Sequence, residues 1–125
     1  ENLRTQLREI HDPNFSRISN EQLEKYVGAY KITKIEGADF GLQIDDIYII
    51  DGRPNFLRIT QASNPGNYFD FYYSGRNTFY YSVDGTSIPL TFESDDSGIL
   101  NGYKLSMNSD QEEGIIYTTK QHPEN

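Results

Sequence analysis

The sequence predicts a mainly β protein, in which an antiparallel meander of about eight strands forms a partly open barrel with a short N-terminal helix or two. Three observations lead to this prediction. Apolar and polar residues alternate with a period of two in short runs between residues 29 and 120. Turn-forming Gly, Pro, Asn and Asp separate these runs at intervals of roughly 10 to 12 residues. No helical pattern interrupts them, so consecutive strands are expected to pair as antiparallel neighbours.

The first predicted helix covers Glu1–His11. Leu3, Leu7 and Ile10 form one apolar stripe, and Asp12-Pro13-Asn14 ends the helix, because the residue before a proline is disfavoured in helical conformation. A stripe this short is not stable alone, so it must pack on the barrel or on a preceding domain.

A second, shorter helix is expected to begin at Ser19. Ser19 to Gln22 has the form of a capping box, in which the serine side chain and the glutamine side chain each bind a free backbone N–H group. Leu23 and Tyr26 supply an apolar face, and Gly28 offers a stop.

The strands follow in regular order. They are predicted at residues 30–35, 41–44, 47–51, 56–61, 68–73, 78–83, 90–93, 103–107 and 115–120. Within them the alternation places five large side chains on the interior face, namely Phe69, Phe71, Phe79, Tyr81 and Phe92. We expect these rings to fill the barrel, because a barrel of about eight strands is just wide enough for side chains. The opposite face is expected to be partly aromatic as well.

Composition excludes several classes of function. The 125 residues carry 11 Lys and Arg against 19 Asp and Glu, a net charge of −8, which argues against a nucleic-acid partner and against docking on an anionic membrane. No apolar run approaches the length of about 18 residues that a membrane span needs. The chain has no cysteine, and therefore no disulfide and no thiolate chemistry.

No catalytic residue, metal site or cofactor is expected. The two histidines, His11 and His122, lie near the chain ends, and no serine-hydrolase or zinc-hydrolase motif occurs. Asp70 and Glu93 lie on strands and are interpreted as outward, solvated carboxylates. The run Asp95–Gly98 resembles the start of a calcium loop, but the ligand glutamate is missing and we interpret it as a turn.

Arginines in the β region give the one alternative. A barrel mouth with an arginine and several tyrosines could hold a carboxylate ligand, although an arginine paired with a surface acid is the more common arrangement. If the barrel binds a ligand, the candidate residues are Arg58, Arg76, Tyr81 and Tyr103.

One run of residues is familiar. Leu-x-x-Tyr-Val-Gly-x-Tyr, from Leu23 to Tyr30, resembles the opening of the lipocalin-like C-terminal domain attached to many bacterial β-lactamase-type (penicillin-binding-protein-like) serine hydrolases. Phe56–Ile59, Thr78–Tyr81, Leu90–Glu93 and Asp96–Tyr103 look like later strands of that family, and Lys120 like its closing lysine. The residues that carry the resemblance are Leu23, Tyr26, Gly28, Tyr30, Phe79, Phe92 and Gly98.

The resemblance implies a non-catalytic accessory barrel that packs on or modulates a protein domain of the same or a partner chain, in an exported, periplasmic or extracellular protein. Residues 1–17 would form a helix and linker, 18–121 the lipocalin-like barrel and 122–125 a tail. The family's catalytic serine and lysine belong to another domain, so none carries over. Two stretches depart from the family: Ile32–Ile50 is long, and Asn64–Asn67 looks like an added loop. The alternative function is a free-standing binder of a small apolar or aromatic ligand.

Overall fold

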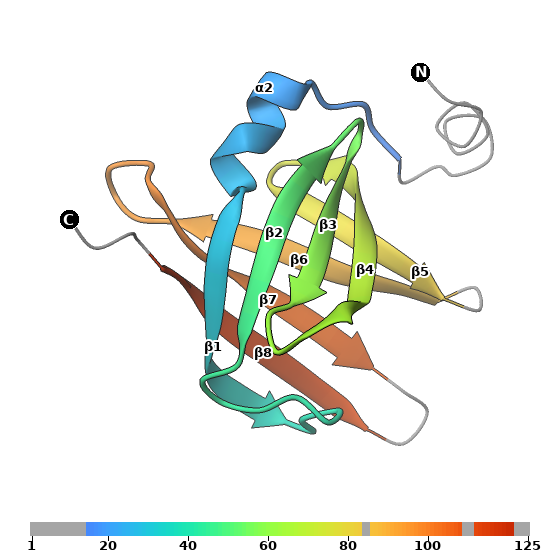
Figure 1. Cartoon of the computed structure of the whole chain (residues 1–125), viewed down its shortest axis with the longest axis vertical. Helices are drawn as coiled ribbons and strands as arrows, with labels where there is room; N and C mark the ends of the chain where they lie inside the picture. Colours follow the sequence, from blue (N-terminus) through green and yellow to red (C-terminus); the bar gives the residue numbers. More distant parts are fainter. Residues whose placement is uncertain (1–14, 84–85, 109–111, 122–125) are drawn as a thin grey trace.

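Eight antiparallel strands follow one another round a closed barrel in the computed structural model of the chain, which describes residues 15–83, 86–108 and 112–121 (Figure 1). The strands are β1 Gly28–Gly37, β2 Ile47–Arg53, β3 Phe56–Gln61, β4 Asn64–Gly75, β5 Thr78–Val83, β6 Thr86–Ser94, β7 Leu100–Asn108 and β8 Glu113–Gln121. Pairing of β1 with β8 closes the circle. The predicted eight-stranded meander is confirmed, and the barrel is more complete than the partly open one that we expected.

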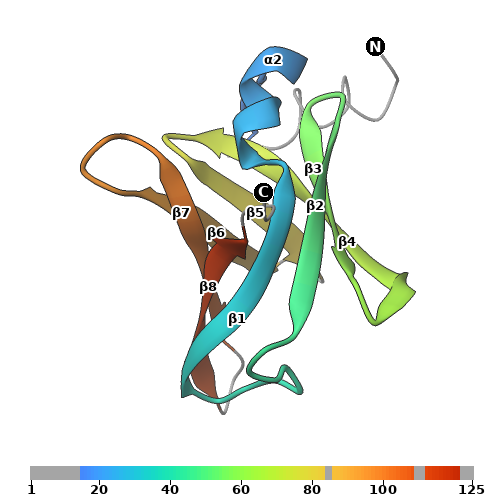
Figure 2. The same cartoon turned by 60° about the vertical axis from the view of Figure 1, so that its left-hand side comes forward.

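A short helix covers one end of the barrel. It consists of α2, Asn20–Leu23, and a 3₁₀ turn η1, Glu24–Tyr26 (Figures 1 and 2). The predicted capping box is present: the Ser19 hydroxyl accepts the Gln22 N–H group at 3.1 Å, and the Gln22 side chain accepts the Ser19 N–H group at 3.2 Å. Leu23 and Tyr26 are each only 1% exposed, so the apolar face of the helix closes this end. Gly28 has a φ of +148°, which suits glycine and lets the chain pass directly into β1.

Two predicted segments differ from the structure. Residues 41–44 are not a strand, because Phe40 and Gly41 have positive φ values of 52° and 85° and the Leu42 N–H group bonds to the Asp39 carbonyl in a turn. Conversely, Asn64–Asn67 is not an added loop but the start of β4, where a register shift between Thr60 and Gln61 accommodates the extra residues as a bulge.

The chain before the helix packs on the barrel from residue 15 onwards. The Phe15 ring lies 6.3 Å from that of Tyr72, and the Ser16 N–H group donates to the Tyr73 carbonyl at 2.7 Å. The predicted helix at 1–11 and the tail at 122–125 lie outside the described residues. No helix in the described ranges is long and apolar enough to cross a membrane.

The predicted faces of the strands are confirmed. Phe71, Phe79, Leu90 and Phe92 are at most 5% exposed and belong to the interior core. On the outer face, the rings of Phe56 and Tyr72 lie 5.3 Å apart and those of Tyr72 and Tyr80 6.2 Å apart, so this surface is partly aromatic, as expected.

Candidate functional site

The half of the barrel interior nearest α2 is filled by a cluster of rings. We call Tyr26, Tyr30, Phe79, Phe92 and Tyr103 the aromatic plug. Phe92 is its centre, with ring centroids at 4.6 Å from Tyr26, 5.8 Å from Tyr30 and 5.6 Å from both Phe79 and Tyr103. In this half the expectation of a filled barrel is met, because large rings from several strands meet at the axis.

The other half is hollow. A cavity of about 300 Å³ lies between the plug and the end of the barrel away from α2. Its walls are mainly apolar, and its lining residues are Ile32, Phe40, Gly41, Leu42, Tyr48, Ile59, Gln61, Asn67, Phe69, Phe71, Tyr81, Ile88, Leu90, Tyr103, Leu105, Met107 and Ile116. Three of the rings that we expected to fill the barrel, those of Phe69, Phe71 and Tyr81, therefore form cavity wall.

The segment between β1 and β2 forms part of the cavity mouth. Two backbone bonds hold its far end to β1: Ile32 N–H donates to the Asp46 carbonyl at 2.9 Å, and Asp45 N–H donates to the Ile32 carbonyl at 2.8 Å. Phe40 and Leu42 then extend over the cavity and line it. Gly114 of β8 allows this approach, because a Cβ at that position would collide with the carbonyl of Ala38.

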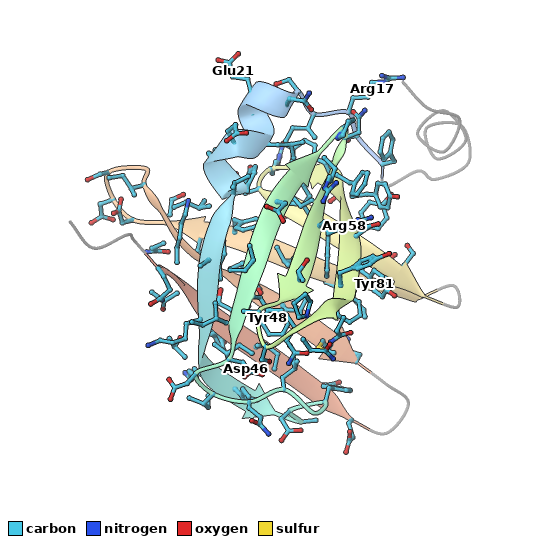
Figure 3. The ribbon with its side chains drawn as sticks, in the orientation of Figure 1. Arg17, Glu21, Asp46, Tyr48, Arg58 and Tyr81 are labelled. Carbon is cyan, nitrogen blue, oxygen red and sulfur yellow. The ribbon has the colours of Figure 1, made fainter. Side chains whose placement is uncertain are left out.

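A chain of polar side chains begins at Asp46 of the same segment and includes two residues that line the cavity. Asn67 donates to the side-chain oxygen of Gln61 at 3.0 Å, and the Gln61 amide donates to the Asp46 carboxylate at 3.3 Å. Figure 3 shows Asp46 and Tyr48 towards the end of the barrel away from α2. The charged group in this chain of contacts is therefore the Asp46 carboxylate, which is negative.

The hydroxyls of Tyr48 and Tyr103 differ from those of the other two plug tyrosines, Tyr26 and Tyr30. The Tyr26 hydroxyl donates to the Asn77 side chain at 2.6 Å, and the Tyr30 hydroxyl donates to the Tyr26 carbonyl at 2.8 Å. Tyr48 and Tyr103, at 5% and 4% exposed, line the cavity, and their hydroxyls bond to none of the residues that the structure describes. Burial raises the pKa of both phenols, with a smaller contribution from Asp46 at Tyr48.

The four candidate ligand-binding residues separate into two groups. Tyr81 and Tyr103 line the cavity. Arg58 does not, because Leu57 and Ile59 face inwards and place it on the outer surface, where its guanidinium binds the Asp70 carboxylate through two bonds of 2.8 and 3.2 Å (Figure 3). Arg76 occupies the β4–β5 turn with a φ of 52°, at the end of the barrel that α2 covers.

The remaining sequence interpretations concern acids. Asp70 pairs with Arg58 on the outer face, and Glu93 is exposed. Asp95 begins a turn, because its carboxylate accepts the N–H groups of Ser97 and Ile99 at 2.8 and 3.0 Å; Gly98, one of the motif residues, has a φ of +83° there. No group of three or more His, Asp or Glu side chains suited to a metal ion occurs among residues 15–83, 86–108 and 112–121.

A second hollow lies where β4 and β5 diverge. Their register contains pairs only from Tyr72, Tyr73 and Gly75, near the end covered by α2. Farther from α2, a hollow of about 260 Å³ lies between the two strands. Phe69 and Tyr81 line both this hollow and the main cavity. Their rings meet edge to face at 5.4 Å, so this ring pair separates the two spaces.

The sequence analysis missed Tyr48 and the cavity itself. In Ile47-Tyr48-Ile49-Ile50 both faces of the strand are apolar, so alternation alone does not show which face is interior. Comparisons with protein-family models, with curated proteins and with solved structures find no match to this chain.

Proposed function

We propose that this chain binds a small, predominantly apolar molecule inside the barrel. The observation that carries the proposal is the cavity of about 300 Å³, which lies at the lower end of the usual range for ligand pockets. A water molecule occupies about 30 Å³ in the liquid, and a methylene group is close to it in size, so the cavity suits a ligand of about ten non-hydrogen atoms.

The cost of leaving this space empty supports the same proposal. Protein interiors are close-packed, and an enclosed void destabilises a protein by about 24 cal/mol per Å³. For 300 Å³ this gives an upper limit of about 7 kcal/mol, since the cavity is partly open. Ile88 and Leu105 both border this space, so larger side chains at these positions would have room to fill part of it. The cavity therefore lowers the stability of the empty barrel, and a bound ligand would restore the lost packing.

The accessory module on a serine hydrolase domain, which the family resemblance implies, stays a prediction, and so does the absence of catalysis. The two functions are compatible, because a module that packs on a partner through its outer face can still hold a ligand in its interior.

Naphthalene is a suitable first probe, because its ten carbon atoms match the cavity volume and it carries no polar group. Isothermal titration calorimetry should give equimolar, saturable binding with a Kd of tens to hundreds of micromolar, as expected for about 0.5 to 0.7 kcal/mol per ligand atom. Leu105→Trp places a large ring in the cavity and should weaken binding at least tenfold. Lys104→Trp is the matched control, because the neighbouring side chain faces outwards.

Two results would contradict the proposal. One is the absence of saturable naphthalene binding by the unmodified chain. The other is an equal loss of affinity in Leu105→Trp and Lys104→Trp, since the binding site would then lie outside the barrel.

A further inference from the structure

The cavity has one polar feature at its inner end that apolar packing does not explain. Tyr103 belongs to the aromatic plug, lines the cavity and is 4% exposed. Its hydroxyl bonds to none of the described residues, whereas the hydroxyls of the other two plug tyrosines, Tyr26 and Tyr30, are both bonded. A buried polar group without a protein partner destabilises the fold, so it is retained most readily where a ligand supplies the partner.

We infer that the ligand carries a hydrogen-bond acceptor without negative charge, such as a ketone, ester or alcohol oxygen, and that the Tyr103 hydroxyl donates to it at the inner end of the cavity. The inference rests on the proposed function and names the ligand class of the same site. It also gives the ligand an orientation: the acceptor points towards the plug, and the apolar body extends towards the mouth.

The backbone of Tyr103 is held in place for this role. The Thr118 hydroxyl accepts the Tyr103 N–H group at 3.1 Å and donates to the Tyr103 carbonyl at 3.3 Å. Gly102 lets β7 and β8 approach closely here, because a Cβ at that position would collide with the Thr118 carbonyl. The ring of Tyr103 also packs on Tyr30 at 5.1 Å. A phenol fixed in this way loses little conformational freedom when a ligand binds.

A second buried tyrosine lines the same cavity. Tyr48 is 5% exposed, lines the same cavity and likewise bonds to none of the described residues. Burial, and then the neighbouring phenols of Tyr48 and Tyr30, raise the pKa of Tyr103, so that it remains a protonated donor at neutral and mildly alkaline pH. The ligand oxygen therefore meets one fixed donor, Tyr103, whose phenol interacts electrostatically with that of Tyr48.

The charge of the site excludes a carboxylate. None of the residues that line the cavity carries a positive charge, and Arg58 lies on the outer face in its pair with Asp70. Beside the mouth, the Asp46 carboxylate accepts the Gln61 amide. An anion bound at Tyr103 would be desolvated without a compensating cation, which is strongly unfavourable.

Three isosteric probes separate these contributions. They are acetophenone, which carries a neutral acceptor, α-methylstyrene, which replaces the oxygen by a methylene group, and benzoate, which carries a negative charge; each is slightly smaller than naphthalene and so fits the cavity volume. Calorimetry should show the ketone binding at least ten times more tightly than the carboxylate. Tyr103→Phe should weaken the ketone about 2- to 10-fold, the range of one net hydrogen bond, and change the hydrocarbon less than 2-fold. Tyr73→Phe, a partly buried tyrosine outside the cavity lining, is the matched control and should leave both unchanged.

Tyr103→Phe is expected to fold, because it removes an unbonded hydroxyl and keeps the ring, so its Tm should be equal to or above that of the unmodified chain. The inference is overturned if the ketone and the hydrocarbon lose affinity equally in Tyr103→Phe, or if the carboxylate binds as tightly as the ketone. In either case a saturable hydrocarbon complex would leave the proposed function standing. Failure of all three probes to bind would overturn both.

Discussion

Removing the same ring atoms from the plug and from the cavity wall should have very different consequences for stability. Phe92 is 3% exposed and contacts four other rings, so Phe92→Ala leaves an enclosed void among them. Phe69 is only partly buried and borders the cavity, with one ring contact at 5.4 Å to Tyr81. Phe69→Ala therefore enlarges a space that already exists.

The expected magnitudes follow from these environments. Truncation of a fully buried phenylalanine costs about 3–5 kcal/mol, the sum of lost transfer free energy and the new void. For Phe69 only part of the transfer free energy is lost, about 1–2 kcal/mol. In a domain of this length, 1 kcal/mol corresponds to a Tm change of about 4 °C, which gives decreases of roughly 12–20 °C for Phe92→Ala and 4–8 °C for Phe69→Ala.

Urea unfolding followed by circular dichroism measures both free energies, with thermal unfolding as an independent check. Phe92→Ala could remove most of the free energy of unfolding of a small domain, so a milder variant is also needed. Phe92→Leu keeps much of the side-chain volume and should lower the free energy of unfolding by less than about 1.5 kcal/mol. Equal losses in Phe92→Ala and Phe69→Ala would refute the reasoning. The interior would then be uniformly packed, and the distinction between plug and cavity would be lost.

Three further predictions concern the mouth, a hydrogen bond on the outer face and the plug. Gly114→Ala should lower the Tm and displace the segment at Ala38, because the added Cβ would overlap the Ala38 carbonyl. The control Gly66→Ala, whose Cβ would make only an ordinary contact at 3.8 Å, should change the Tm by less than about 2 °C. Equal Tm shifts in the two variants would contradict the close approach of Gly114 to Ala38. The Tyr117 hydroxyl donates to the Glu36 carboxylate at 2.6 Å and lowers the pKa of Glu36. Tyr117→Phe should therefore raise the pKa of Glu36 towards 4.5 in carboxyl NMR titrations. An unchanged pKa would show that this hydrogen bond is not the main cause of the lowered value. Burial raises the pKa values of the plug tyrosines, that of Tyr26 to about 12, so the unfolded chain releases these protons first. Stability should therefore be complete below pH 10 and fall between pH 10 and 12. Ionisation of all ten tyrosines together near pH 10 without unfolding, followed by phenolate absorbance, would argue against a buried plug.

Much of the fold could be predicted because it depends on local patterns. The alternation through Phe69, Phe71, Phe79 and Phe92 shows which side chains face inwards, and this holds in the structure. The capping box at Ser19 depends on four consecutive residues and was equally readable. The outward position of Arg58 also follows from its neighbours, because Leu57 and Ile59 face inwards. The prediction that Arg58 could bind a ligand inside the barrel did not take this alternation into account.

The candidate site was harder to predict from the sequence, because a cavity depends on the volume left between side chains and not on the alternation of apolar and polar residues. An inward-facing ring such as Tyr81 has the same sequence signature whether it reaches the barrel axis or forms the wall of a cavity. The turn at residues 39–42 lies in a stretch that looked like a strand, yet positive φ values at Phe40 and Gly41 bend it over the mouth.

The sequence by itself therefore determined the meander of about eight strands, the buried face of those with clear alternation and the capped helix that closes one end, since all of these depend on neighbours along the chain. Only the tertiary structure decided that β1 pairs with β8, that five rings meet in one half of the barrel while the other half stays hollow, and that Tyr103 belongs to the plug and also lines that cavity. These properties depend on the register between distant strands, which sets the width of the barrel and the height at which each side chain enters it.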